Sequence, residues 1–253
     1  MRTIKRLLHW LFGRRSPRRI IDGEEFRQRY EMGERNFSHY TLMNADLRGL
    51  ALRGMDLRYA DLRLVRDLRD RVDLTRADLT GADLSNTNLS QLDLSYAVLC
   101  DANLRGADLS RANLTGADLS GADLSRAVLT RSQVEGANFS AARLCHADLH
   151  QLSALGVNFS SANLHGANLS KGDLERVNFS RSNLSSTNLS WANLNSANFS
   201  GAILLQSNLS WADLAASNPE FARRIRKTTF TGARVAEGVY WSEEVTSGTW
   251  GQT

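Results

Sequence analysis

A five-residue rule runs through this chain and limits what it can fold into more than any other feature. In each unit a small residue, an Asp or Asn, a large apolar residue, a Ser or Thr and a variable residue follow in that order, as in "ANLTGADLSGADLS" at 112–125. The rule continues without a break through 29 units, from Val72 to Ala216. An amphipathic helix repeats every 3.6 residues and a strand every 2, so neither fits a strict period of 5.

The phenylalanines of the repeat add a longer period. They are spaced by twenty, at Phe139, Phe159, Phe179 and Phe199. Four units therefore make one turn of a four-sided coil, with the large and the small apolar residue of each unit pointing inward. The unit at 152–156 exchanges these volumes, because Leu152 stands where Ala is the rule and Ala154 where Leu is. Close packing of a narrow interior demands such an exchange.

The limits of the stack follow from the register of the large apolar residues. An upstream series keeps the same spacing, at Phe37, Leu42, Leu47, Leu52, Leu57 and Leu62. Two residues too many separate Leu62 from Leu74, which predicts a bulge or loop near 65–71. The predicted stack thus spans 35–216 in about nine coils, at about 4.8 Å per coil. Because one coil cannot bury its own apolar ladder, both ends need caps.

The flanking segments supply candidates for those caps. Before the stack, 22–34 places Phe26 and Tyr30 at helical spacing ahead of Gly33, which predicts an N-terminal capping helix. After it, 217–253 predicts a short helix from Pro219, then one or two degenerate units around Phe230 and Val235, and a covering segment. Residues 1–21 form a basic N-terminal extension.

The tandem A(D/N)LXX pattern over about 180 residues resembles the pentapeptide-repeat proteins. The resemblance implies an all-β solenoid, a right-handed quadrilateral parallel β-helix, here with short helical caps at both ends. It implies no common enzymatic activity. Members of the family include gyrase-protecting proteins that imitate DNA and others that act as scaffolds or bind partners.

Charge bears on the DNA-mimic alternative. From 72 to 216 there are nine Lys and Arg against thirteen Asp and Glu, a net charge of −4. This negative charge is small for a surface that imitates the phosphates of duplex DNA. Aspartates at the second place of the unit gather in the first half of the repeat, at Asp73, Asp78, Asp83, Asp93, Asp108, Asp118 and Asp123. We expect Asp and Asn there for hydrogen bonding in turns. Mimicry that modulates DNA gyrase or topoisomerase remains the alternative.

One outward column is unusual. Reading every twentieth residue gives Gln91, Arg111, Arg131, Gln151, Lys171, Trp191 and Trp211. Exposed Trp flanked by cations is typical of binding hot spots. We therefore take Arg111, Arg131, Lys171, Trp191 and Trp211 as a candidate interaction surface. In the alternative, the two indoles stack on each other beneath the C-terminal cap.

Two other groups of side chains lead to weaker expectations. The arginines at 48, 53, 58 and 63 should ring one coil as a solvated collar, with contact to nucleic acid or lipid as the alternative. Cys145 and His165 are twenty apart and should be ladder neighbours, but no third orienting group accompanies them. We expect no catalytic, cofactor-binding or metal site, and the two cysteines, Cys100 and Cys145, indicate no disulfide framework.

The N-terminal extension is basic and amphipathic. One helical face would carry Ile4, Leu7, Leu8, Leu11 and Phe12. Three readings stay open: an interfacial helix on an anionic membrane, a helix that docks in a partner's groove, and a frayed or self-packed extension.

These observations favour a non-enzymatic rigid scaffold or adaptor that mediates protein–protein interaction, and the first two interpretations of the N-terminal basic helix would make that helix its tether. The alternatives are the DNA mimic and a peripheral membrane-associated structural protein. The partner is unidentified, direct nucleic-acid binding is not expected, and the oligomeric state is left open. The expected location is the cytoplasm, with peripheral membrane association as the alternative.

Overall fold

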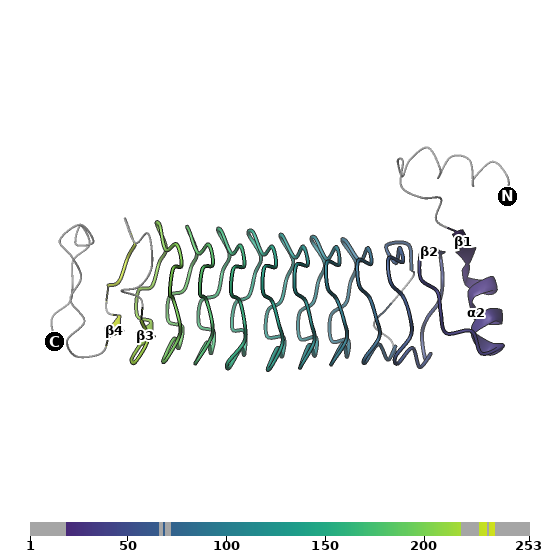
Figure 1. Cartoon of the computed structure of the whole chain (residues 1–253), viewed down its shortest axis with the longest axis horizontal. Coiled ribbons are helices and arrows are strands. Elements are labelled where there is room, and N and C mark those ends of the chain that lie inside the picture. The colour runs from purple at the N-terminus through teal and green to yellow at the C-terminus, as the bar shows by residue number, and fades with distance from the viewer. Residues whose placement is uncertain (1–18, 66–67, 69–71, 219–227, 232, 236–253) are drawn as a thin grey trace.

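The computed structural model describes residues 19–65, 68, 72–218, 228–231 and 233–235. Within these residues the chain forms a stack of similar coils along one long axis (Figure 1). We name the five places of each unit the inner small residue, the bridge residue, the central residue, the turn residue and the corner residue. In the unit at 112–116 these are Ala112, Asn113, Leu114, Thr115 and Gly116 in that order.

Neighbouring coils are joined by backbone hydrogen bonds at the bridge residues. Bridge residues twenty apart form single parallel bridges, from Asp73 with Asp93 to Asn193 with Asp213. Around one such bridge, the Leu119 N–H donates to the Asn138 carbonyl at 2.8 Å and the Asn138 N–H to Ala117 at 2.9 Å. Because each side contributes one bridge before the chain turns, regular strands are scarce.

Regular sheet occurs only at the two ends of the described stack. Strand β1 (Arg19–Asp22) pairs in parallel with β2 (Tyr40–Met43), and β3 (Asp213–Leu214) pairs in parallel with β4 (Arg234–Val235). Between the two sheets, the long axis of the molecule is spanned by single bridges and turns.

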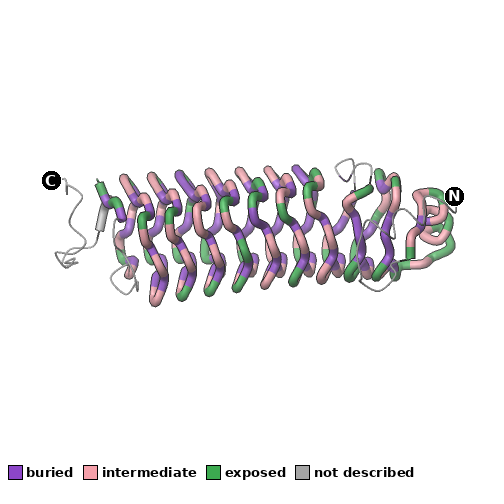
Figure 2. Tube along the Cα trace, turned by 90° about the horizontal axis from the view of Figure 1, so that it is seen from above, coloured by how far each residue is buried: buried purple, intermediate pink, exposed green. Residues whose placement is uncertain are grey.

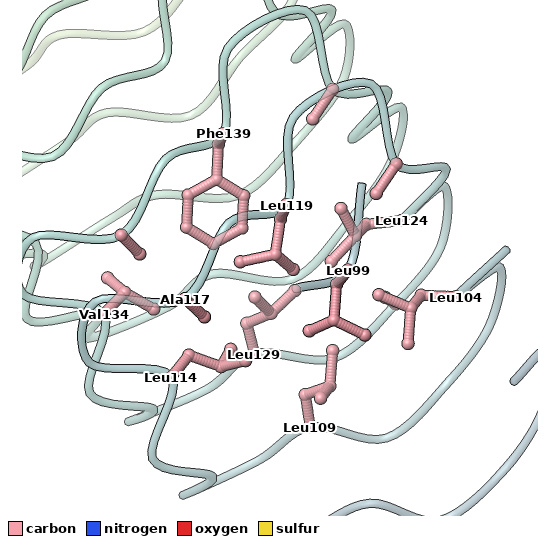
Figure 3. Packing of buried hydrophobic residues seen from close by; sticks show 14 of the residues in the cluster. Leu99, Leu104, Leu109, Leu114, Ala117, Leu119, Leu124, Leu129, Val134 and Phe139 are labelled. Atoms are coloured by element: carbon pink, nitrogen blue, oxygen red, sulfur yellow. The ribbon is translucent and has the colours of Figure 1, made fainter. Parts of the chain in front are cut away.

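The core runs through the centre of all the coils. Along each coil, buried residues alternate with intermediate or exposed ones (Figure 2). Figure 3 shows Leu99, Leu119 and Phe139 one behind another, each from a different coil. Phe139, Phe159 and Phe179 continue this column with ring centroids 4.9 and 5.6 Å apart, which confirms that twenty residues close one coil.

The exchanged unit at 152–156 keeps its place in the core. Leu152 is 1% exposed and Ala154 is fully buried. The pair therefore supplies one large and one small inward side chain, as the other units do, with the order reversed. This is the volume exchange that the sequence predicts.

Two extra residues interrupt the period upstream. Ala51, Asp56 and Asp61 bridge to residues twenty-two further along, at Asp73, Asp78 and Asp83, where the rest of the repeat spans twenty. The surplus lies where the register of the leucines requires it, between Leu62 and Leu74. Of the predicted irregular segment, Leu68 is buried, and 66–67 and 69–71 lie outside the described residues.

The N-terminal end differs from the expected boundary between an extension at 1–21 and a stack that starts at 35. Helix α2 (Gly23–Glu31) lies within the predicted capping segment, and its N-cap Asp22 accepts a hydrogen bond from the Glu25 N–H at 2.9 Å. However, β1 precedes α2 and already pairs with β2, with Ile21 buried opposite Leu42. The placement of 19–21 in the extension was wrong, because the inserted helix hides the five-residue register.

The C-terminal end continues the stack beyond the last regular unit. Thr229 bridges to Asn208, and the Leu209 N–H donates to the Thr229 carbonyl at 2.7 Å. Phe230 is 5% exposed and takes the central place after Leu209. The degenerate units expected around Phe230 and Val235 thus extend the coils, with a spacing of twenty-one. The predicted helix from Pro219 and the covering segment lie outside the described residues.

Candidate interaction surface

In the repeat from Val72 to Ala216, the corner residue of every unit has the same left-handed backbone conformation. Each turn closes with a hydrogen bond from the next inner small residue to the central carbonyl, as from Ala77 N–H to Leu74 at 3.1 Å. The corner residue has a positive φ, for example 58° at Arg76 and 63° at Gly81. A positive φ at the third residue alone is typical of a type II turn, where glycine is favoured. A non-glycine corner residue therefore carries a conformational cost.

Corner side chains lie across the corner of the following coil. At Gly81, an added Cβ would lie 2.4 Å from the ring of Tyr59. At Gly116 it would lie 2.6 Å from the ring of Tyr96. A large corner side chain thus occupies the space that the next corner side chain would need. Glycine in the next coil removes the conflict, and where glycine is absent the two side chains must stack.

Along one corner of the stack glycine is absent for seven successive coils. We call these seven residues the corner ladder: Gln91, Arg111, Arg131, Gln151, Lys171, Trp191 and Trp211. All seven have φ between 57° and 64°. On the other three sides, the corner residue is Gly, Ala or Ser in several coils. The predicted candidates Arg111, Arg131, Lys171, Trp191 and Trp211 therefore lie on one line along the stack.

Contacts within the corner ladder order its side chains. Arg131 Nε donates to Gln151 Oε1 at 2.8 Å. The rings of Trp191 and Trp211 are stacked with centroids 5.3 Å apart and planes 15° apart. The two indoles remain 58% and 53% exposed. They do stack on each other, as one of the two sequence hypotheses has it, and they also present large apolar surface. The cap proposed above them lies outside the described residues.

A depression of about 450 Å³ lies beside the cationic part of the corner ladder. It is lined by Gln91, Ser110, Arg111, Thr130, Arg131, His150 and Gln151. Ser110, Thr130 and His150 are turn residues on the same side, and they were not among the residues predicted from the sequence. Reading every twentieth residue from Ser90, as from Gln91, would have found them.

The aspartates on this side of the stack accept hydrogen bonds from groups other than Arg111 and Arg131. Asp108 Oδ1 accepts from the Ser110 N–H at 2.9 Å. Asp148 accepts from the His150 N–H at 3.1 Å, from Asn168 Nδ2 at 3.2 Å and from Thr130 Oγ1 at 3.4 Å. Within the described part of the chain no carboxylate forms a salt bridge with Arg111 or Arg131. These two guanidinium groups therefore come from adjacent coils without a neutralising acid between them.

The bridge aspartates bear out the turn interpretation. Asp73, Asp78 and Asp93 each accept the N–H two residues on, at 2.9, 3.1 and 2.9 Å. Asp83, Asp108, Asp118 and Asp123 do the same at 2.9–3.1 Å. Their oxygens thus close the outer turn of each unit, which is the role that short polar side chains take in such turns.

The arginine collar is held by aspartates at the bridge positions of its own units. Arg48, Arg58 and Arg63 pair with the acid two residues before them, Asp46, Asp56 and Asp61, at 2.6–2.7 Å. Hydrogen bonding from Arg58 lowers the pKa of Asp56, although burial opposes this. Three of the four predicted collar arginines are therefore held in ion pairs, unlike the arginines of the corner ladder, and among the described residues no such pair is seen for Arg53, whose unit has Ala51 at the bridge position.

The cysteines and histidines do not converge on a centre. Cys145 Sγ lies 3.9 Å from the Asn163 carbonyl, and the rings of His146 and His165 meet edge to face with centroids 5.4 Å apart. Among the described residues there is no group of three or more His, Cys, Asp or Glu side chains that could hold a metal ion. Burial raises the pKa of the Cys100 thiol, which disfavours its thiolate.

The other candidate region cannot be placed. Ile4, Leu7, Leu8, Leu11 and Phe12 lie outside the described residues. Among the residues that are described, no helix has both the length and the apolar character needed to cross a membrane.

Comparisons with known proteins give the following matches. A family model described as pentapeptide repeats matches in eight copies, over 70–106, 93–131, 107–144, 122–153, 142–181 and 182–218. The solved structure of HetL, a pentapeptide repeat protein involved in heterocyst differentiation regulation from the cyanobacterium Nostoc sp. strain PCC 7120, is 33% identical, with a TM-score of 0.49. That match covers 87% of this chain and 99% of HetL.

Two further solved structures match over shorter stretches. A pentapeptide repeat protein from the Arabidopsis thaliana thylakoid lumen is 35% identical over 40% of this chain and 67% of its own, with a TM-score of 0.25. QnrB1, a plasmid-mediated fluoroquinolone resistance protein, is 22% identical over 65% of this chain and 85% of its own, with a TM-score of 0.35. No curated protein matches the chain.

Proposed function

The chain belongs to the pentapeptide-repeat family, and from this premise we propose that it is a non-enzymatic, rigid scaffold or adaptor that binds a protein partner through the corner ladder. The proposed frame is the right-handed, four-sided β-helix implied by the family resemblance. In it, each coil is tied to the next by the same backbone hydrogen bonds on every side. Such a frame holds outward side chains at fixed spacing. It therefore suits the binding of a partner better than a function that requires conformational change.

The outer position of the depression supports binding in preference to catalysis. Its lining is made of long corner side chains, two turn hydroxyls and the His150 imidazole on the outside of the coils. Catalysis relies on groups that are held away from water and matched in pKa. Arg111, Arg131 and two glutamines offer hydrogen bonds and charge to a bound surface instead.

The observation that carries the proposal is the absence of glycine from the corner ladder. Glycine would fit each of the seven left-handed turns without strain, and large side chains there cost conformational energy. Two of these side chains are exposed indoles, which gain little from burial. When a sequence repeatedly chooses a locally unfavourable residue, a functional reason is the usual explanation.

Capture of partners by paired variants tests the proposal. The full chain and a Trp191→Ser/Trp211→Ser variant are immobilised and the proteins that they retain from the native cell extract are quantified. A Tyr59→Ser/Tyr96→Ser variant is the matched control, since those tyrosines are exposed corner residues on other sides, at 46% and 56% exposure. We expect a protein retained by the full chain and the control to be lost with the indoles. Equal retention by all three chains would refute the proposed surface.

The N-terminal extension is proposed as a tether on an anionic membrane surface. Ile4, Leu7, Leu8, Leu11 and Phe12 would enter the interface, and the arginines after Gly13 would approach the headgroups. Liposome co-sedimentation of the full chain against a chain that starts at Arg18, so that β1 is kept, tests this point. Equal sedimentation of the two chains would contradict it, and the adaptor role at the corner ladder would stand.

We do not extend the proposal to DNA mimicry. The bridge aspartates are hydrogen-bonded into their own turns, and asparagine holds most bridge positions after Asn138. A continuous line of negative charge along the stack is therefore missing from the described coils. Inhibition of gyrase supercoiling at stoichiometric protein would restore this alternative.

A further inference from the structure

We propose that the corner ladder binds a short, extended, acidic segment of the partner, with carboxylates over Arg111, Arg131 and Lys171 and an apolar side chain against the Trp191–Trp211 pair. This inference rests on the proposed function and specifies the chemistry of the partner. Four observations support it: the charge of the ladder, its hydrogen-bonding groups, its length and its apolar end.

Charge selects the sign of the ligand. The repeat as a whole is acidic, with nine Lys and Arg against thirteen Asp and Glu from 72 to 216. Three of those nine cations lie on the corner ladder, which carries no acid. Arg111 and Arg131 follow one another in adjacent coils, and like charges in adjacent ladder positions repel. An anionic ligand removes this repulsion, so its binding is favoured here more than at an isolated arginine.

The depression supplies hydrogen bonds that fit carboxylates and a peptide backbone. Arg131 is held in place by Gln151 at 2.8 Å, so less side-chain freedom is lost when it binds. Ser110, Thr130 and His150 lie beside the two arginines. The side-chain amides of Gln91 and Gln151 offer both donors and acceptors, as the N–H and C=O groups of an extended peptide require.

The spacing of the ladder matches an extended chain. Coils repeat every ~4.8 Å, so the five steps from Arg111 to Trp211 span roughly 24 Å. An extended peptide rises about 3.3 Å per residue and places alternate side chains on one face, so about seven residues cover this distance. Four of them face the ladder. Three acidic residues and one apolar residue, in alternation with others, would pair with the three cations and the indoles.

The same features disfavour a long polyanion. Three cations over the three steps from Arg111 to Lys171, roughly 14 Å, neutralise few phosphates, and nucleic-acid affinity depends on the number of phosphates neutralised. A short acidic peptide meets the cationic strip and ends at the indoles, where its apolar side chain finds the exposed rings.

The experiment uses a fluorescein-labelled peptide, EGEGEGL, and its neutral analogue QGQGQGL, titrated with the full chain at ~0.1 M ionic strength. We expect saturable anisotropy with the acidic peptide and about a tenfold smaller response with the neutral one, as for the loss of several charge-assisted contacts. The variant Arg111→Gln/Arg131→Gln should weaken binding of EGEGEGL about tenfold, and Trp191→Ser/Trp211→Ser by less.

The matched control is Arg126→Gln/Arg181→Gln. These arginines are also corner residues with positive φ, at 62° and 58°, but they lie on other sides of the stack. We expect this variant to bind as the unaltered chain does, and thermal unfolding of all variants to show that none has lost its fold. Equal weakening by both arginine pairs would overturn the inference, because it would mean attraction by net charge alone.

Two other outcomes also overturn it. Tighter binding of a labelled oligo-dT strand than of EGEGEGL would indicate a nucleic-acid surface. No binding of EGEGEGL, while the indole variant still loses a captured partner, would leave the adaptor role in place and refute the acidic segment. If EGEGEGL does not bind and the indole variant also retains every protein that the full chain retains, the proposed function itself is refuted.

Discussion

In the N-terminal coils, from Asn36 to Asp83, carboxylates at the bridge positions lie beside arginines, whereas the coils from Asp118 to Asn218 carry amides at most of the same positions. Arg58 pairs with Asp56 at 2.7 Å in its own coil and lies 3.7 Å from Asp78 in the next. Arg63 lies 2.7 Å from Asp61 and 3.4 Å from Asp83 in the same way. Each arginine thus bridges two stacked carboxylates.

In the C-terminal coils, one ladder of bridge residues from Asp118 to Asn218 stacks amides on a single carboxylate. Asn138 Nδ2 donates to Asp118 Oδ1 at 3.1 Å, and Asn158 Nδ2 to Asn138 Oδ1 at 3.1 Å. Asn178, Asn198 and Asn218 continue the chain at 3.2, 3.4 and 3.3 Å. Every Oδ1 from Asp118 to Asn198 also accepts its own turn N–H. The ladder therefore starts at a carboxylate and proceeds through groups that both donate and accept.

The difference shows that stacking, more than the single unit, decides between Asp and Asn. Within one turn either side chain accepts the N–H two residues on. Between coils about 4.8 Å apart, two carboxylates repel, while two amides bond. Arginine at the turn residue makes stacked Asp tolerable, and Asp73 above Asp93 is the exception that lacks one.

The largest effect should come from the core that both regions share. Phe159 is fully buried between Phe139 and Phe179, and Phe159→Ala should lower the free energy of unfolding by about 3–5 kcal/mol. Leu99→Ala, in the same column below the phenylalanines, should cost about 2–5 kcal/mol. Urea denaturation followed by circular dichroism measures both. A cost under about 1 kcal/mol for Phe159→Ala would break the claim of a close-packed common core.

Loss of the Arg63 guanidinium from the N-terminal coils should lower the free energy of unfolding nearly as much. Asp61 is 2% exposed and pairs with Arg63, so Arg63→Met removes a charge that compensates a buried carboxylate. We expect a loss of about 3 kcal/mol in urea denaturation. Arg48→Met is the control, because its pair is exposed and should be worth at most about 1 kcal/mol.

A double variant tests whether an amide can replace the pair of carboxylate and arginine in the N-terminal coils. Asp61→Asn in the Arg63→Met background keeps the oxygen that accepts the turn N–H and removes the buried charge. We expect it to recover part of the lost stability. If the double variant were as unstable as Arg63→Met, the loss would come from packing of the arginine stem and not from charge.

A charge placed inside the amide ladder should have an intermediate effect. Asn158→Asp removes the donor to Asn138 Oδ1 and sets two acceptors against each other, at a cost of about 1–2 kcal/mol near neutral pH. Asn163→Asp is the matched control. Asn163 starts its ladder beside Arg143 and accepts from Asn183, so a carboxylate fits there and the change should stay within about 0.5 kcal/mol. Equal costs at the two sites would mean that ladder position does not matter.

Much of this organisation could be predicted from the sequence, because the rule is periodic. Inward residues, the twenty-residue coil and the two surplus residues before Leu74 all follow from spacing alone. The corner ladder was found by reading every twentieth residue. The start of the stack at Arg19 was not found, because α2 interrupts the count between Ile21 and Leu42. Where a helix is inserted, register depends on three-dimensional pairing and not on sequence distance.

The contacts between coils needed the structure. From sequence, Arg58 and Arg63 formed a collar, and the structure makes each a bridge between two carboxylates. The change from Asp to Asn after Asn138 was visible in the sequence, but its cause was not, since a single unit favours both residues. The depression beside Arg111 was missed for a similar reason, because its hydroxyls come from the turn residues of different coils.

The smallest effect on stability should come from Asp118, the first residue of the amide ladder. Burial raises the pKa of Asp118, but hydrogen bonds from the backbone and side chain of Ser120, from Cys100 and from Asn138 outweigh it, so the pKa is lowered. A carboxyl with a lowered folded-state pKa stabilises the fold above its unfolded value, near 3.9, and this contribution is lost as the pH falls through the folded value. Asp118→Asn keeps an oxygen for Ser120 and Asn138 and removes only the charge.

The Asp118→Asn variant should therefore be about 0.5 kcal/mol less stable than the unaltered chain at pH 7, and the difference should shrink at about pH 2, since protonation of the wild-type carboxyl removes its contribution as the pH falls through the lowered folded-state pKa. Urea denaturation at both pH values gives the comparison. A deficit that persists in acid would show that the ladder depends on the shape of the aspartate and not on its charge. The arginine-bridged coils would then be the only part of the described stack in which the charge of a bridge residue matters for stability.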